Sequence, residues 1–95
     1  MHAPFASITD NLNVKVYPNP VISSGVIEYT IDNYTDVSIK IFDITGKEIH
    51  SIENKNASPG IYQEIIHRDQ LGGNNICFIK VTTDTQSKII KLIIS

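Results

Sequence analysis

The 95-residue sequence has no tryptophan, one cysteine and no apolar run long enough to cross a membrane. The single cysteine, Cys77, cannot form a disulfide within the chain. A zinc site would need ligands from His2, His50 and His67, which lie far apart and lack the spacing of a metal motif. Because a membrane-spanning helix needs about 20 apolar residues, membrane insertion is not predicted.

A strong charge of one sign is also missing. The chain carries 8 Lys and Arg residues against 10 Asp and Glu residues, a net charge of −2, and its lysines are scattered. Nucleic-acid-binding proteins concentrate basic residues on one surface, where they contact phosphates. The composition therefore argues against DNA or RNA as a partner, and no residue pattern calls for a cofactor.

The sequence does contain short runs that alternate apolar and polar residues between turn residues. A period of two residues is typical of strands with one buried face. The predicted strands are 12–17, 27–31, 37–41, 47–52, 61–67, 76–83 and 87–95, with a loop at 53–60 and a corner between sheets at 69–75. Seven short strands without a helical period predict an all-β fold, an immunoglobulin/fibronectin-like antiparallel β-sandwich. A small barrel is the alternative.

Two turns have a clear local cause. Pro18-Asn19-Pro20 ends the first strand, because two prolines have fixed φ angles and no amide donors for a ladder. Asp43-Ile44-Thr45-Gly46 closes a hairpin, in which Asp43 bonds its own backbone downstream and Gly46 takes a positive φ. The turn does not need Lys47, which makes this lysine a candidate for contact with a partner.

The run from Ser87 to Ser95 is predicted to be a final strand with two different faces. The residues expected to fill the core are Ile90, Leu92 and Ile94. The solvated face is expected to carry the lysines Lys88 and Lys91 together with Ile89 and Ile93. If this strand lies at a sheet edge, its unpaired N–H and C=O groups can accept a partner strand.

Other chemistry-bearing residues have simple structural explanations. Cys77 occupies an inward strand position, as expected for an inert buried thiol. Four turn carboxylates could gather to hold calcium, but bonding to their own backbone is the simpler explanation. They are Asp32, Asp36, Asp43 and Asp84. Asn33-Tyr34-Thr35 fits a glycosylation sequon, and a turn accounts for it too.

An ordered set of motifs resembles a known family. The set comprises Val16-Tyr17-Pro18-Asn19-Pro20, Ile27-Glu28-Tyr29, Phe42-Asp43-Ile44-Thr45-Gly46-Lys47, Leu71 to Gly73 and Lys91-Leu92-Ile93-Ile94. Its order and spacing resemble a type A C-terminal sorting domain of the type IX (Por) secretion system over Leu12 to Ser95. One departure is Asn75-Ile76-Cys77, where the family usually carries Gly-x-Tyr.

The resemblance implies a non-catalytic secretion signal at the end of a cargo protein of Bacteroidetes-type bacteria. The translocon would carry the protein from the periplasm through the outer membrane to the cell surface or the medium, and a sortase-like protease would then remove the signal. Residues 1–11 would be a linker from the cargo domain, with cleavage in His2 to Asn11, and residues 12–95 the sorting domain. The resemblance also implies that the parent protein carries an ordinary export signal at its own N-terminus, which would explain why Met1 to Asp10 lacks the pattern of a signal peptide.

The candidate residues for recognition by the translocon lie in the two turns and the final strand. They are Tyr17, Pro18, Asn19, Pro20, Asp43, Gly46, Lys47, Lys88, Ile89, Lys91, Ile93 and Ser95. The alternative function is an adhesive or carbohydrate-binding module of a surface protein. That alternative needs an exposed aromatic platform, for which only Tyr17, Tyr34 and Phe42 are available. No constellation of residues supports an enzyme.

Overall fold

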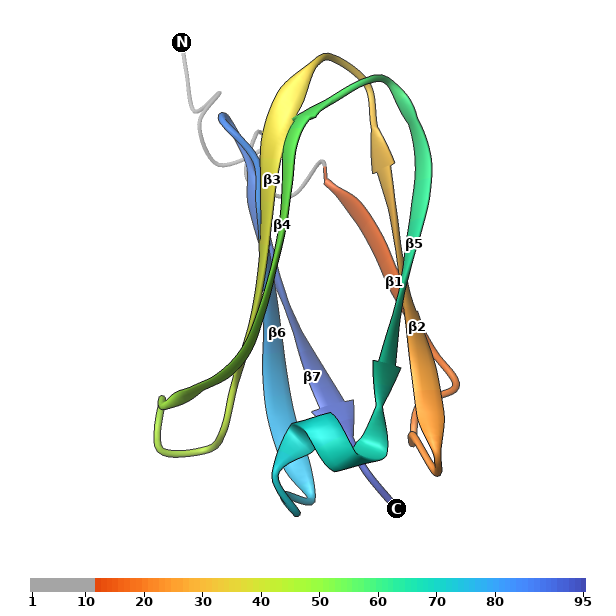
Figure 1. The fold of residues 1–95 in the computed structure, drawn as a ribbon, viewed down its shortest axis with the longest axis vertical. Coiled ribbons are helices and arrows are strands. Elements are labelled where there is room, and N and C mark those ends of the chain that lie inside the picture. Colours follow the sequence, from red (N-terminus) through yellow and green to blue (C-terminus); the bar gives the residue numbers. More distant parts are fainter. Residues whose placement is uncertain (1–11) are drawn as a thin grey trace, which may run out of the picture.

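The computed structural model describes residues 12–95, so the predicted linker and cleavage region lie outside the described residues. The strands are β1 (Asn13–Tyr17), β2 (Ser24–Ile31), β3 (Thr35–Phe42), β4 (Glu48–Ala57), β5 (Gly60–His67), β6 (Ile76–Thr82) and β7 (Ser87–Ile93). A short 3₁₀ helix, η1 (Arg68–Leu71), lies between β5 and β6 (Figure 1). Within residues 12–95, no helix has the length and hydropathy to span a bilayer.

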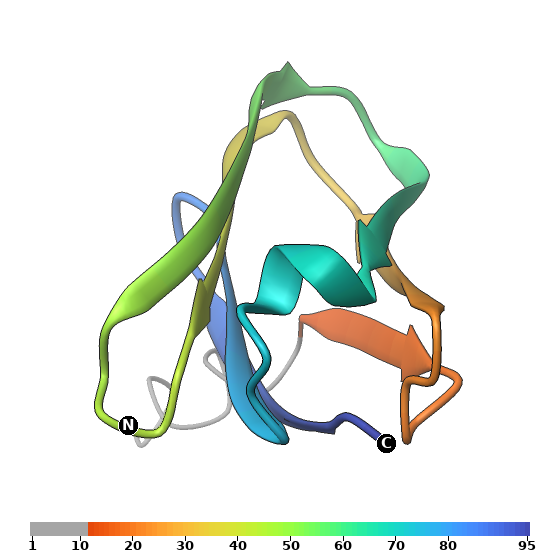
Figure 2. The same ribbon diagram turned by 60° about the horizontal axis from the view of Figure 1, so that its bottom comes forward.

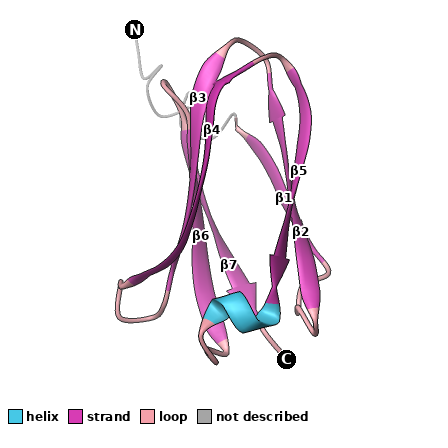
Figure 3. Ribbon diagram, viewed as in Figure 1, coloured by secondary structure: helices cyan, strands magenta, loops and turns pink. Residues whose placement is uncertain are grey.

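The strands form two antiparallel sheets that face each other, which confirms the predicted seven-stranded sandwich. One sheet has the order β1-β2-β5 and the other the order β4-β3-β6-β7. The chain passes between the sheets after β2, after β4 and after β5, and η1 makes the last of these passages across one end of the sandwich (Figure 2). The predicted corner at 69–75 is therefore confirmed, and Figure 3 shows η1 as a helical segment among strands.

The core lies between the sheets and is built by the predicted alternation. Buried side chains from the first sheet include Ile27, Tyr29 and Ile66, and the second sheet contributes many others. The latter are Val37, Ile39, Ile41, Cys77, Ile79, Val81 and Leu92. The Tyr29 ring stacks on that of Tyr62 with centroids 5.4 Å apart, and the Tyr29 hydroxyl accepts a hydrogen bond from Asn54.

The predicted loop at 53–60 is wrong for most of its length, because β4 continues to Ala57. Polar bonds hold this part of β4 against β3 in place of apolar packing. The Ser38 hydroxyl donates to the Glu53 carboxylate at 2.9 Å, and the Asn56 backbone N–H donates to the Asp36 carboxylate at 2.7 Å. A bulge between Thr35 and Val37 accommodates this extension.

Strand β7 lies at the edge of the four-stranded sheet, beside β6. Leu92 and Ile94 are buried and Ile90 packs against the core, as predicted, whereas Ile89 and Ile93 are exposed. The prediction was wrong for Lys88, which is half-buried on the same side of the strand as Ile90. The period of two explains the difference, since residues 88, 90, 92 and 94 share one face.

Candidate functional site

The Pro-Asn-Pro corner and the last strand, far apart in sequence, meet in the structure. The Asn19 side-chain amide donates to the Lys91 carbonyl at 3.3 Å, and its oxygen accepts the Ile93 backbone N–H at 3.1 Å. Both proline peptide bonds in the corner, at Pro18 and Pro20, are cis. A single side chain thus satisfies two backbone groups that an edge strand would otherwise expose.

Val21 extends this contact by forming a parallel bridge with Ile94. Its N–H donates to the Ile93 carbonyl at 2.8 Å, and its carbonyl accepts the Ser95 N–H at 2.8 Å. Gly25 permits the approach, because a Cβ at that position would lie 2.9 Å from a Val21 methyl group. The edge of β7 is therefore closed from the Lys91 carbonyl to Ser95.

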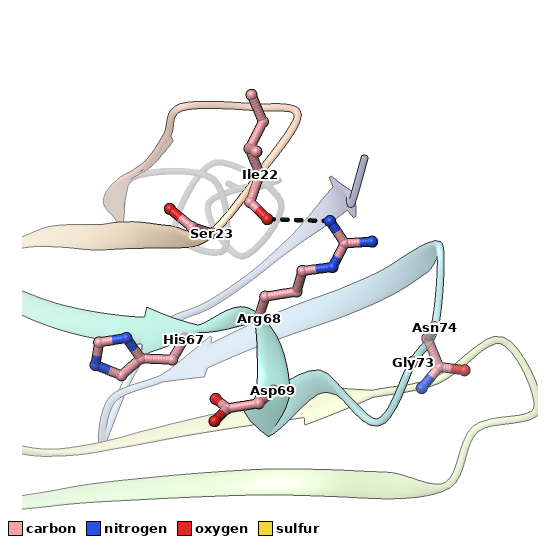
Figure 4. Close-up of a pocket in the computed structure, with 7 residues that line it drawn as sticks. All are labelled: Ile22, Ser23, His67, Arg68, Asp69, Gly73 and Asn74. Carbon is pink, nitrogen blue, oxygen red and sulfur yellow. Dashed lines mark hydrogen bonds between the residues drawn. The ribbon is translucent and has the colours of Figure 1, made fainter.

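Arg68 of η1 ties the same corner to the end of the chain. Its guanidinium Nη1 donates to the Ile22 carbonyl at 3.1 Å (Figure 4). The same nitrogen also donates to the main-chain oxygen of Ser95. Ser95 is thus held by Val21 and by Arg68, although it lies beyond the last residue of β7.

A pocket beside Arg68 is lined by Ile22, Ser23, His67, Asp69, Gly73 and Asn74 as well. Polar groups are present, but Figure 4 shows the Ser23, His67 and Asp69 side chains at separate positions, with none directed at another. No hydrogen bond within residues 12–95 joins any two of these three side chains. The pocket therefore lacks the bonded nucleophile and base that covalent catalysis uses.

The outer face of β6 and β7 combines exposed apolar groups with lysines. In the register of these strands, Ile89 lies opposite Lys80 and Lys91 lies opposite Phe78. Ile89 is 62% exposed and Ile93 is 44% exposed. The predicted outer face of Ile89, Lys91 and Ile93 is thus present, and the sheet extends it onto β6.

The β3–β4 turn has the predicted local chemistry. Asp43 Oδ1 accepts hydrogen bonds from the Thr45 hydroxyl, the Thr45 N–H and the Lys47 N–H at 2.6, 2.9 and 3.0 Å, and Gly46 has a φ of 89°. These bonds, chiefly that from the Thr45 hydroxyl, lower the pKa of the Asp43 carboxyl. Asp43 and Gly46 thus serve the turn itself, whereas Ile44 and the Lys47 side chain are exposed.

The structure does not gather all the predicted recognition residues on one surface. The turn at Asp43 to Lys47 joins β3 to β4, on the side of the sheet away from β7. Tyr17 lies on the outer face of the other sheet, where its hydroxyl donates to Glu28 at 3.2 Å and accepts from Gln63 at 3.2 Å. The Asn19 corner and β7 form one unit, here called the corner–strand surface, which comprises residues 18–22 and 87–95.

A comparison with protein families identifies the family of this domain. Residues 15–95 match the secretion system C-terminal sorting domain. The chain belongs to this family. The match confirms the resemblance to type IX sorting domains, and the sorting domain is therefore a C-terminal signal for type IX secretion that leads to the cell surface or the exterior. A comparison with curated proteins found no match.

The sorting domain gives no support to a metal site within residues 12–95, where no group of three His, Cys, Asp or Glu side chains could hold an ion. Asp36 accepts the Asn56 N–H and Asp43 organises its own turn, so these two carboxylates have structural partners. Cys77 is fully buried, and burial raises the pKa of its thiol. Such a thiol remains protonated and unreactive at neutral pH.

The three rings considered for carbohydrate binding lie on separate surfaces. Tyr17 is on the outer face of the β1-β2-β5 sheet, and Phe42 is half-buried on the outer face of the other sheet, opposite Phe78. Tyr34 is exposed in the turn between β2 and β3. They form no common platform.

Several exposed isoleucines were not identified from the sequence. They are Ile22 beside Arg68, Ile44 in the β3–β4 turn, and Ile61 and Ile65 on β5. The exposure of Ile65 could have been predicted, because adjacent residues of a strand face opposite sides and Ile66 fills the core. The isoleucines in the turns have no comparable signal.

Replacing Asn19 by leucine, which has a similar size, is expected to loosen the end of β7. The change removes both side-chain hydrogen bonds and leaves the Ile93 N–H to solvent, at a cost of about 0.5–1.5 kcal/mol because the site is exposed. Hydrogen exchange should become faster at Ile93 and Ser95 and stay unchanged at the Leu92 amide, which faces β6. Unchanged exchange at Ile93 would contradict the contact.

Proposed function

We propose that the sorting domain directs an attached upstream cargo protein through the outer-membrane type IX translocon, without catalysing a reaction itself. The cargo crosses from the periplasm, and a sortase-like protease cuts upstream of β1, in His2 to Asn11. The translocon reads the corner–strand surface, and the β3–β4 turn forms a second contact through Lys47.

The observation that carries this proposal is the pair of hydrogen bonds in which the Asn19 side chain donates to the Lys91 carbonyl and accepts from the Ile93 N–H. They join two motifs of the family resemblance, 72 and 74 residues apart, into one exposed surface. A fold needs buried contacts for stability, but it does not need Ile89 and Ile93 to face solvent beside Lys91. Apolar groups left exposed beside charges are typical of a surface that a partner covers.

The test is a reporter with an N-terminal signal peptide and the full 95-residue chain at its C-terminus, expressed in a bacterium that has the type IX system. The reporter is expected in the medium or on the cell surface, shortened by proteolysis upstream of residue 12. A reporter that stays in the periplasm would overturn the proposal. A host without the translocon is the control for leakage.

Charge reversal separates recognition from stability. Lys47→Glu and Lys91→Glu are expected to reduce export while leaving the melting temperature unchanged, because neither lysine forms an ion pair within residues 12–95. Lys55→Glu is the control for net charge, since this exposed lysine on β4 changes the charge equally and its 4.0 Å ion pair with Glu53 lies on the surface, where such pairs contribute little to stability. Equal export by all three variants would remove Lys47 and Lys91 from the recognition surface.

A further inference from the structure

The edge of β7 is closed at one end and open at the other. In an antiparallel pair, alternate residues direct their N–H and C=O groups toward the neighbouring strand. The Ile94 N–H donates to the carbonyl of Asn75, the residue before β6. The backbone N–H and C=O groups of residues 88, 90 and 92 therefore also point toward β6, and those of residues 87, 89 and 91 point toward the open edge. No hydrogen bond within residues 12–95 reaches the Ile89 N–H, the Ile89 carbonyl or the Lys91 N–H.

The side chains around this open segment carry positive charge and apolar surface. Neither β6 nor β7 contains an acidic residue, and within residues 12–95 both ion pairs involve lysines of other strands. Lys91 and Ile89 point to the outer face, while Lys88 and Ile90 are half-buried on the inner side. The charged residues 88 and 91 thus bracket the two isoleucines.

We propose that Ser87–Lys91 accepts a strand from a partner protein, and that four successive residues of this strand are acidic, apolar, apolar and acidic. The inference rests on the proposed function and specifies how the translocon reads the corner–strand surface. Residues paired across neighbouring strands have Cβ atoms about 5 Å apart, so partner carboxylates would pair with Lys88 and Lys91 and apolar side chains with Ile89 and Ile90. The order is the same in both directions, so the pattern holds for a parallel or an antiparallel strand.

The length of the added strand follows from its two boundaries. At one end, the Asn19 side chain already donates a hydrogen bond to the Lys91 carbonyl. At the other end, the turn at Thr83 to Gln86 precedes β7 and ends the open edge. Only about five residues of edge remain, so backbone pairing alone gives a weak complex, and specificity depends on the four side chains.

Proline substitution tests the backbone pairing. Ile89→Pro removes an outward N–H and leaves the bonds to β6 intact, which edge strands tolerate. Ile65→Pro is a closely matched control on the edge strand β5, since Ile65 is 61% exposed. The Arg68 N–H donates to the Ser23 carbonyl at the end of the β2–β5 pair, so in this register the N–H of Ile65, three residues earlier, points away from β2. Ile89→Thr removes the apolar side chain but keeps the N–H. Ile89→Pro is expected to reduce export about tenfold at an unchanged melting temperature, and Ile65→Pro to leave export unchanged.

A peptide titration tests the chemistry of the partner independently of export. The probe is the blocked peptide Thr-Glu-Val-Val-Glu-Thr, added to the ¹⁵N-labelled 95-residue chain. Saturable shifts are expected at the Ile89 and Lys91 amides with slower hydrogen exchange at Ile89, and the same peptide with lysine for glutamate should bind about tenfold more weakly. Ile89→Thr should bind more tightly than Ile89→Pro, since it retains the backbone donor.

Each outcome bears on the proposal. Full export of Ile89→Pro would overturn strand addition and leave the sorting function in place. If the wild-type fusion itself stays in the periplasm, the sorting function fails, and the peptide titration alone decides the inference. The inference would also be overturned if both peptides bound equally or if the peptide bound at the Ile65 edge. Self-association that Ile89→Pro abolishes would overturn it too, because the edge would then belong to a second copy of the chain.

Discussion

Replacing Leu92 by alanine is expected to lower the free energy of unfolding by about 2–5 kcal/mol. Leu92 is completely buried, and its truncation leaves a cavity against β6 and the opposite sheet. The adjacent change Ile93→Ala should alter the free energy by less than about 0.5 kcal/mol, because exposed side chains lose few contacts. For a domain of this size, Leu92→Ala should lower the melting temperature by at least about 8 °C.

The two variants should also separate the two roles of β7. Leu92→Ala is expected to reduce export through unfolding, whereas Ile93→Ala keeps the fold and tests recognition directly. Deleting Lys88 to Ser95 cannot make this distinction, since it removes a core strand and the exposed surface together. A larger loss of stability for Ile93→Ala than for Leu92→Ala would mean that β7 is paired one residue out of register.

Truncating Tyr29 to alanine is expected to have a comparable or larger effect, a loss of about 3–5 kcal/mol. The side chain is fully buried, stacks on Tyr62 and accepts a hydrogen bond from Asn54, which lies on the opposite sheet. Tyr29→Phe should cost only about 0.5–1.5 kcal/mol, the value of that hydrogen bond. Urea denaturation measures both values on the same scale.

A double-mutant cycle identifies the contribution of the ring stack. Combining Tyr29→Leu with Tyr62→Leu should show a coupling of about 0.5–1.5 kcal/mol. Independent, additive effects of the two changes would contradict the stacked geometry. Because Tyr62 is half-buried on the edge strand β5, Tyr62→Leu alone should cost less than Tyr29→Ala.

Residues whose role is set locally were predictable from the sequence. The alternation in β7 placed Leu92 and Ile94 in the core, and Asp43 with Gly46 predicted a turn whose hydrogen bonds the structure contains. Both features depend on neighbours within a few positions. Seven such alternating segments were sufficient for the sandwich class.

Features that depend on distant partners were not predictable. Pro18-Asn19-Pro20 indicated the end of a strand, but nothing in its residue types shows that Asn19 bonds to Lys91 and Ile93. The extension of β4 was missed for the same reason, because its polar residues are held by Asp36 and Ser38 on β3. The local pattern of residues indicates which segments can form a strand. The residues that supply hydrogen bonds to a polar strand are determined by the fold.

The parallel bridge between Val21 and Ile94 also concerns the order in which the domain is made. Of the seven strands of the domain, β7 is synthesised last, yet it supplies core residues and closes the corner that follows β1. A chain interrupted before β7 can neither complete the sandwich nor present the corner–strand surface. Formation of the signal is thereby coupled to synthesis of the whole domain, so that an exporter reading this surface would reject cargo whose sorting domain is incomplete.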